Sequence, residues 1–141
     1  MKEILRILPV VLYMLVGFIS VVMALKNFSS KKFLPFYEQA SGKHWEDIDD
    51  PVKIIILSLM KLVGLGFLTQ AILMTVFPLV NYFSPDPVNG ILIPAVAFLF
   101  CTGLFAVNFS LFKKTKAETP WKGSLYAMVI LLIGMIVSTF N

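Results

Sequence analysis

The chain has 141 residues, of which 58% are apolar and 14% are charged, and it carries a formal net charge of +4. A soluble domain contains about 25% charged residues, so this composition excludes an ordinary soluble protein and indicates a chain that folds in lipid. The single cysteine, Cys101, excludes an internal disulfide and argues against thiol redox chemistry.

Four apolar segments each approach the roughly 20 helical residues that a bilayer core about 30 Å thick requires. They are Ile4–Leu25, Ile54–Leu79, Ile91–Phe112 and residues 122–140. Their apolar runs are continuous rather than alternating, so we expect helices and not barrel strands. The predicted fold class is all-α: one domain over residues 1–141, an integral membrane antiparallel bundle of four transmembrane helices.

The first apolar segment follows the basic residues Lys2 and Arg6, as the core of a signal peptide would. The run is longer than an ordinary signal-peptide core, and no clear small-residue cleavage site follows it. We therefore expect this segment to be retained as the first span.

Basic residues are distributed unequally between the two sides that four spans create. The side with both termini carries Lys2 and Arg6, whereas the side with the first and third loops carries nine lysines. The positive-inside rule then predicts that loops one and three are cytoplasmic and that both termini lie outside. The expected location is a bacterial inner membrane.

Three span starts show a capping residue directly before a proline: Asp50-Pro51, Asp86-Pro87 and Thr119-Pro120. The cap side chain accepts from a free N–H of the first turn, and proline at the first helical position loses no hydrogen bond. The loops that follow from these starts are short for the second and third connections. Short connections predict that helices two, three and four pack in sequence order.

The first loop, residues 26–50, is too long for a simple turn. Its aromatic and small residues recur at helical spacing, at Phe33, Phe36, Tyr37 and Ala40. This pattern predicts a short amphipathic helix in the membrane interface, which Gly42 is placed to end. A second short turn is expected over residues 43–48.

Small residues recur inside the spans, where they would let helix backbones approach closely in lipid. They are Gly17, Ser20, Ala24, Gly64, Gly66, Gly103, Ala106, Ala127, Gly134 and Ser138. Three prolines inside the spans, Pro9, Pro78 and Pro94, are expected to bend or end their helices.

Lys61 is the sharpest candidate for a functional residue, because it lies within an apolar run and a lysine in hydrocarbon costs about 3 kcal/mol. Two interpretations remain open. Lys61 binds a ligand or ion, or its long side chain reaches the interface while residues 62–79 cross the membrane. Gln70 and the other polar residues of the spans are expected to form interhelical hydrogen bonds or to line a small polar cavity.

An acidic cluster of Glu46, Asp47, Asp49 and Asp50 lies beside His44, the only histidine. Oxygen and imidazole ligands suit a divalent metal, but the spacing matches no established metal motif. Capping and favourable interaction with the start of the second span explain the acids without a metal. We predict no metal site, and His44 has no neighbouring nucleophile for catalysis.

The chain resembles small bacterial four-helix membrane proteins of the DoxX-like kind. The matching features are Tyr37 with Gly42-Lys43-His44-Trp45, Met60-Lys61-Leu62-Val63-Gly64, and Thr119-Pro120-Trp121. The resemblance implies an inner-membrane bundle with a structured first loop, in which Trp45 and Lys61 belong to one site. It supplies no catalytic residues.

The leading hypothesis is a non-enzymatic membrane protein without a cofactor, which binds a lipid-like or small apolar ligand or serves as a membrane partner subunit. Lys61 would meet an anion or carbonyl, Trp45 would form a lid, and Tyr37, His44 and Gln70 complete the candidate ligand-binding residues. The alternative is a small transporter or channel-like oligomer. A membrane enzyme is a third hypothesis, for which only His44 with the nearby carboxylates offers paired acid–base groups. Lys61 and Gln70 are about 180° apart around a helix, which counts against one shared pore face. The expected partners are the bilayer, a second copy or a membrane protein, and not nucleic acid.

Overall fold

The computed structural model describes residues 2–140, which are helical in six segments and contain no strand. The elements are α1 (Lys2–Ser29), α2 (Pro35–Ser41), the 3₁₀ turn η1 (Trp45–Asp47), α3 (Asp50–Phe83), α4 (Pro87–Thr115) and α5 (Trp121–Ser138). Four of them, α1, α3, α4 and α5, are long and apolar enough to cross a membrane. The prediction of an all-α bundle of four apolar helices is confirmed.

The helices α1, α3 and α4 extend at both ends beyond the apolar segments that predicted them, whereas α5 stops two residues short of the predicted end. The longest, α3, has 34 residues and is about 51 Å long, well beyond the bilayer core of about 30 Å. Residues around the apolar run, such as Lys53 and Asn81, continue the helix because nothing in them breaks it. The helix is therefore about 20 Å longer than a bilayer core is thick.

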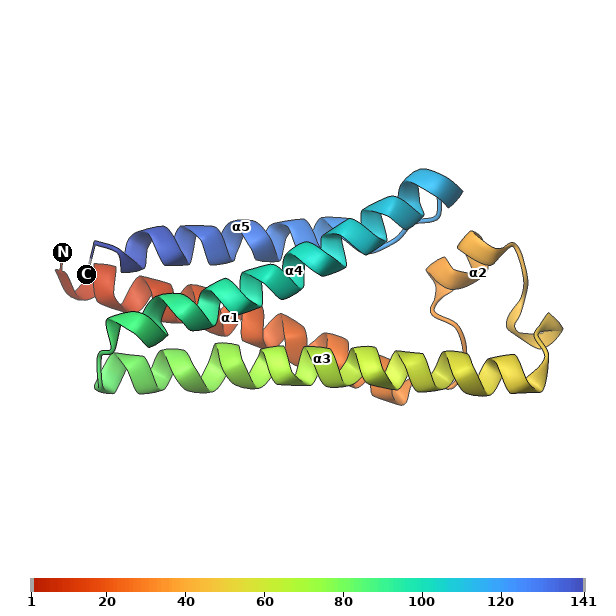
Figure 1. The fold of residues 1–141 in the computed structure, drawn as a ribbon, viewed down its shortest axis with the longest axis horizontal. Coiled ribbons are helices and arrows are strands. Elements are labelled where there is room, and N and C mark those ends of the chain that lie inside the picture. Colours follow the sequence, from red (N-terminus) through yellow and green to blue (C-terminus); the bar gives the residue numbers. More distant parts are fainter. Residues whose placement is uncertain (1, 141) are drawn as a thin grey trace.

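The central helix is α1, which packs along both α3 and α5, while α5 also packs along α4. The predicted sequential packing holds for α4 and α5 but is weak for α3 and α4, which diverge from their shared turn toward Thr115 (Figure 1). Between these two helices, the rings of Phe67 and Phe100 meet edge to face at 5.7 Å. Such bulky side chains hold the α3 and α4 backbones apart.

Small residues explain why α1 occupies the centre. A Cβ atom at Gly17 would lie 2.7 Å from Thr75 Cγ2 of α3, and one at Gly134 would lie 2.5 Å from the Tyr13 ring. Ser20 and Ala24 of α1 are also buried, so the predicted stripe on this helix is confirmed. The prediction is wrong for Gly103, where a Cβ atom would meet nothing within 4 Å.

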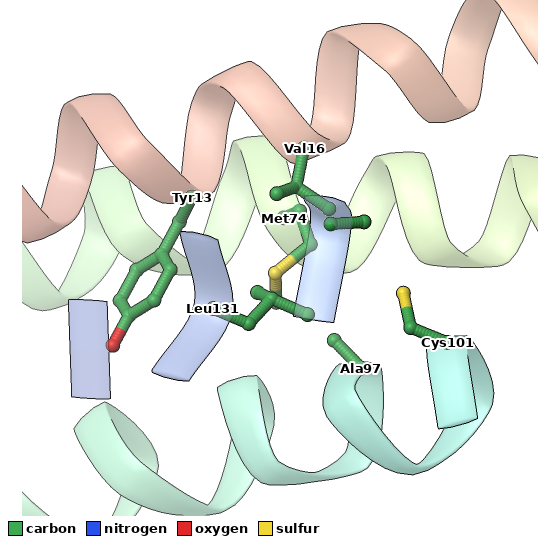
Figure 2. Close-up of a cluster of buried hydrophobic side chains, with 7 residues drawn as sticks. Tyr13, Val16, Met74, Ala97, Cys101 and Leu131 are labelled. Carbon is green, nitrogen blue, oxygen red and sulfur yellow. The ribbon is translucent and has the colours of Figure 1, made fainter. Parts of the chain in front are cut away.

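The core combines side chains from all four long helices (Figure 2). Its members are Tyr13, Val16, Met74, Ala97, Cys101, Ala127 and Leu131. The Tyr13 hydroxyl points away from Met74 and Leu131 (Figure 2). In lipid, van der Waals packing of this kind holds helices together, because moving apolar surface out of lipid gives no hydrophobic gain.

Only one of the three predicted helix caps forms. Asp86 accepts a hydrogen bond from Val88 N at 3.0 Å. Asp50 instead lies inside α3 and pairs with Lys53 at 3.2 Å, and Asp49 takes the cap position without a side-chain bond. The Thr119 hydroxyl donates to the Asn108 carbonyl at 2.8 Å, so it ties α4 to the loop rather than capping α5.

The short helix expected in the first loop is present as α2, which begins at Pro35, so Phe33 of the predicting pattern lies outside it; Gly42 follows its last residue in a left-handed conformation (φ 65°). The expected second turn is η1. Gln39 of α2 accepts a hydrogen bond from the Glu118 N–H at 2.9 Å, so the loop is attached to the third loop at the same end of the bundle. Figure 1 shows α2 beside the projecting start of α3.

Large apolar side chains are exposed around the outside of the bundle. Phe18, Leu99 and Val107 are each about two-thirds exposed, at 65%, 71% and 69%. A soluble protein rarely leaves so many large apolar side chains in water, whereas a membrane offers them a matching solvent. The four apolar helices and this outer surface are those of a membrane-integral protein.

Candidate functional site

A cavity of about 910 Å³ lies at the end of the bundle where α1 begins, α3 turns into α4 and α5 ends. We call it the proline cavity, because five of its lining residues are prolines. Its polar lining residues are Arg6, Tyr13, Asn81, Tyr82, Asp86, Asn89, Ser138 and Thr139. Its other lining residues are Leu5, Pro9, Val10, Phe77, Pro78, Pro85, Pro87, Gly90, Ile91, Ile93, Pro94 and Phe140.

Arg6 stands at the polar end of the proline cavity. Its Nη2 donates to the Tyr82 carbonyl at 2.7 Å, and its guanidinium lies over the Tyr82 ring at 4.9 Å from the centroid. The ring and the carbonyl together hold the orientation of the guanidinium. A guanidinium has five N–H donors, so most of its hydrogen-bonding capacity is left for a bound group.

Hydrogen bonds build the α3–α4 turn that forms the second polar wall. The Asn81 side-chain oxygen accepts from the Asp86 N–H at 2.8 Å. The Asp86 carboxylate then accepts from Val88 N at 3.0 Å and from Asn89 Nδ2 at 2.7 Å. These bonds fix the place of a carboxylate on the cavity wall at the start of α4.

The inner wall of the proline cavity is apolar. The three prolines within helices, Pro9, Pro78 and Pro94, are buried and all line it. They were expected to bend or end their helices, and α1, α3 and α4 continue through them. Tyr13 lies two helical turns, about 10 Å, deeper than Arg6 along α1. The cavity is thus charged at the bundle end and mainly apolar toward the core, where the Tyr13 and Ser138 hydroxyls, 3.3 Å apart, are the polar groups of the lining.

The predicted site residues Tyr37 and Trp45 do lie together, around Phe33. The Phe33 ring is 6.0 Å from Tyr37 and 5.1 Å from Trp45, and the Trp45 N–H donates to Glu38 Oε1 at 3.2 Å. Burial raises the pKa of Tyr37 above its usual value of 10, so this residue is a neutral phenol at physiological pH.

A small space, the loop-one cavity, lies between this aromatic group and α3. Its volume is about 160 Å³, and its lining is Phe33, Tyr37, Ile56, Leu59, Met60 and Val63. Ligand pockets usually measure about 300–1,000 Å³, so this cavity is small for a lipid-sized ligand.

The remaining predicted site residues do not line the loop-one cavity, although Lys61 directly follows Met60, which does. Lys61 is exposed on α3 and is about 33 Å along the helix from Phe83, the distance across a bilayer core. Gln70 is buried deeper in the bundle, where Nε2 donates toward Cys101 Sγ at 3.3 Å. His44 is exposed at the cap position of η1. The structure therefore does not bring Lys61 and Gln70 to one site.

The acidic cluster beside His44 remains spread along the surface. Within residues 2–140, no three His, Cys, Asp or Glu side chains lie close enough together to hold a metal ion. Asp50 is occupied by its ion pair with Lys53, and the Lys53 ammonium also lies 5.9 Å from the centroid of the Trp45 ring. These contacts stabilise the start of α3 and the turn before it.

Sequence reasoning missed the proline cavity, although it treated several of its residues. Arg6 was considered only in the count of basic residues, and Asp86 only as a helix cap. The prolines were considered only for their effect on helix shape. One signal was present: the four-span topology already placed the start of the chain, the second loop and the chain end on one side. Comparison of the chain with protein-family models, curated proteins and solved structures gave no match.

Proposed function

We propose that this membrane protein binds a lipid-like amphiphile in the proline cavity. The observation that carries the proposal is a volume of about 910 Å³ with Arg6 at one end and an apolar wall toward the core. This volume lies in the range of small-molecule sites, about 300–1,000 Å³. An amphiphile with its polar head at the bundle end and its apolar tail toward the core would match the change in polarity along the cavity lining.

The physics of lipid favours an amphiphile over a purely apolar ligand. An apolar ligand moves from lipid into an apolar wall, and this transfer brings little hydrophobic gain. Polar contacts at the open end provide the selective part of the affinity, because a charge-assisted hydrogen bond to the guanidinium distinguishes one polar head from another. Arg6 retains most of its donors for such contacts.

The distribution of lysines favours an orientation in which the proline cavity faces the outside of an inner membrane. The first and third loops, with nine lysines, are then cytoplasmic. Tyr37, Trp45 and the loop-one cavity would form a separate feature on the cytoplasmic side. The transporter alternative needs polar groups along one path, and the separation of Lys61 from Gln70 gives it no support.

Native mass spectrometry of the full chain, purified in a mild detergent, tests the proposal. We expect one amphiphile per chain to persist at activation energies that remove the detergent. Organic extraction should release it for identification by mass. A chain that carries no bound amphiphile under any gentle condition, and takes up none of the bilayer lipids added back, would contradict the proposal.

A further inference from the structure

We propose that the head of the bound amphiphile is zwitterionic, with a phosphate that meets Arg6 and a primary ammonium that meets Asp86. This inference rests on the proposed function and names the ligand class of the proline cavity. Both residues line that cavity and carry opposite charges.

Arg6 is suited to the phosphate. Tyr82 fixes the guanidinium through its carbonyl at 2.7 Å and its ring at 4.9 Å. The planar fork of an arginine can donate two parallel hydrogen bonds to a phosphate, and these charge-assisted bonds are about twice as strong as neutral ones. A side chain already held in place loses less conformational entropy when the phosphate binds.

Asp86 is suited to the ammonium. Its two carboxylate oxygens accept one hydrogen bond each, from Val88 N at 3.0 Å and Asn89 Nδ2 at 2.7 Å. An ionised carboxylate has about four acceptor positions, so each oxygen retains capacity for another donor. A primary ammonium offers three N–H donors and the opposite charge, which neither existing partner provides.

Arg6 and Asp86 do not neutralise one another. Among the described side chains, the ion pair within 4.0 Å is that of Lys53 with Asp50, at the other end of α3. An anionic head would pair with Arg6 but be repelled by Asp86. A cationic head would pair with Asp86 but be repelled by Arg6. An uncharged head would form an ion pair with neither residue. Only a head that carries both charges can pair with Arg6 and Asp86 at the same time.

The experiment measures retention of three lipids with identical acyl chains by the full-length protein in competition, using native mass spectrometry. The lipids are phosphatidylethanolamine, phosphatidylglycerol and diacylglycerol. We expect wild type to prefer phosphatidylethanolamine over either competitor by about tenfold or more. Equal retention of all three lipids would overturn the zwitterion inference and leave the proposed function standing. Retention of none would contradict both.

Two variants test which residue contacts the ammonium and which contacts the phosphate. Asp86→Asn keeps a good helix cap and removes the negative charge, so it should abolish the preference for phosphatidylethanolamine over phosphatidylglycerol. Arg6→Gln should lower the retention of both phospholipids relative to diacylglycerol and should leave phosphatidylethanolamine above phosphatidylglycerol, because the ammonium still meets Asp86. The matched control is Glu3→Gln, which removes an exposed charge one turn before Arg6 and outside the cavity lining. The inference is wrong if Asp86→Asn and Glu3→Gln retain the same lipid preference as wild type.

Discussion

The Tyr13 ring lies against Gly134 so closely that a Cβ atom at position 134 would be 2.5 Å from the ring carbon Cε1. The Tyr13 hydroxyl lies 3.3 Å from Ser138 Oγ, one helical turn further along α5. Tyr13 is part of the core cluster and also lines the proline cavity. The contact between α1 and α5 therefore forms the boundary between the packed core and the cavity.

Gly134→Ala should destabilise the bundle, because the new methyl group would overlap a buried ring that its hydroxyl contact with Ser138 helps to hold. Overpacking of this kind costs about 1–3 kcal/mol. The measurement is the free energy of unfolding of the detergent-solubilised protein under a denaturing-detergent titration, followed by helical circular dichroism.

The matched control is Gly103→Ala, in a helix interior where the added methyl meets nothing within 4 Å. Alanine is favoured over glycine in a helix by up to about 1 kcal/mol, so this variant should unfold at the same or a higher denaturant concentration. Equal destabilisation by the two substitutions would show that the close contact of Tyr13 with Gly134 is absent.

Replacing Asp86, which caps α4, should lower the free energy of unfolding more than replacing Asp50, which was predicted to cap α3 but does not. Asp86→Ala deletes the bond to Val88 N and should lower the free energy of unfolding by about 1 kcal/mol, while Asp86→Asn should restore it. Asp50→Ala deletes only an exposed i,i+3 pair, worth at most about 0.5 kcal/mol. The same titration compares the three variants, and a larger loss for Asp50→Ala than for Asp86→Ala would reverse the structural assignment.

Lys61→Met should leave amphiphile retention unchanged, because Lys61 is exposed on α3 and does not line the proline cavity. Native mass spectrometry of the variant checks this expectation. Loss of the bound amphiphile in Lys61→Met, with the helical circular dichroism spectrum preserved, would move the site back to the start of α3 and the first loop.

Gln70→Leu should change stability little. Gln70 is buried and donates at 3.3 Å to Cys101 Sγ and at 3.5 Å to the Ala97 carbonyl, and an interhelical hydrogen bond in lipid is worth about 0.6 kcal/mol on average. We expect a loss below about 1 kcal/mol in the denaturing-detergent titration. A loss of several kcal/mol would show that Gln70 belongs to a larger polar network than these two contacts.

The sequence was sufficient for the parts of the fold that depend on local pattern. Long apolar runs predicted the four long helices, the helical spacing of Phe36, Tyr37 and Ala40 predicted a short helix in the first loop, and Gly42 predicted its end. The packing order was harder, because it depends on which faces fit: Gly17 allows α3 to approach α1, whereas Phe67 and Phe100 separate α3 from α4.

The candidate site was harder still to predict, because the proline cavity joins residues from distant parts of the chain. Arg6 contacts Tyr82, and Tyr13 contacts Ser138, at separations that no local pattern encodes. Each residue also had a sufficient local explanation, such as the cap for Asp86. A charge in an apolar run made Lys61 the leading candidate, yet α3 is so long that a span of about 30 Å measured from Phe83 ends near Lys61.

The most direct test of the central claim is to fill the proline cavity and count the bound amphiphile. Val10 lines the cavity, and its neighbour Val11 is 55% exposed on the outside of α1. Native mass spectrometry should show that Val10→Trp loses the amphiphile, while Val11→Trp retains it at the wild-type stoichiometry of about one per chain. Both variants should keep the wild-type helical circular dichroism spectrum. Undiminished retention in a folded Val10→Trp protein would contradict binding in this cavity.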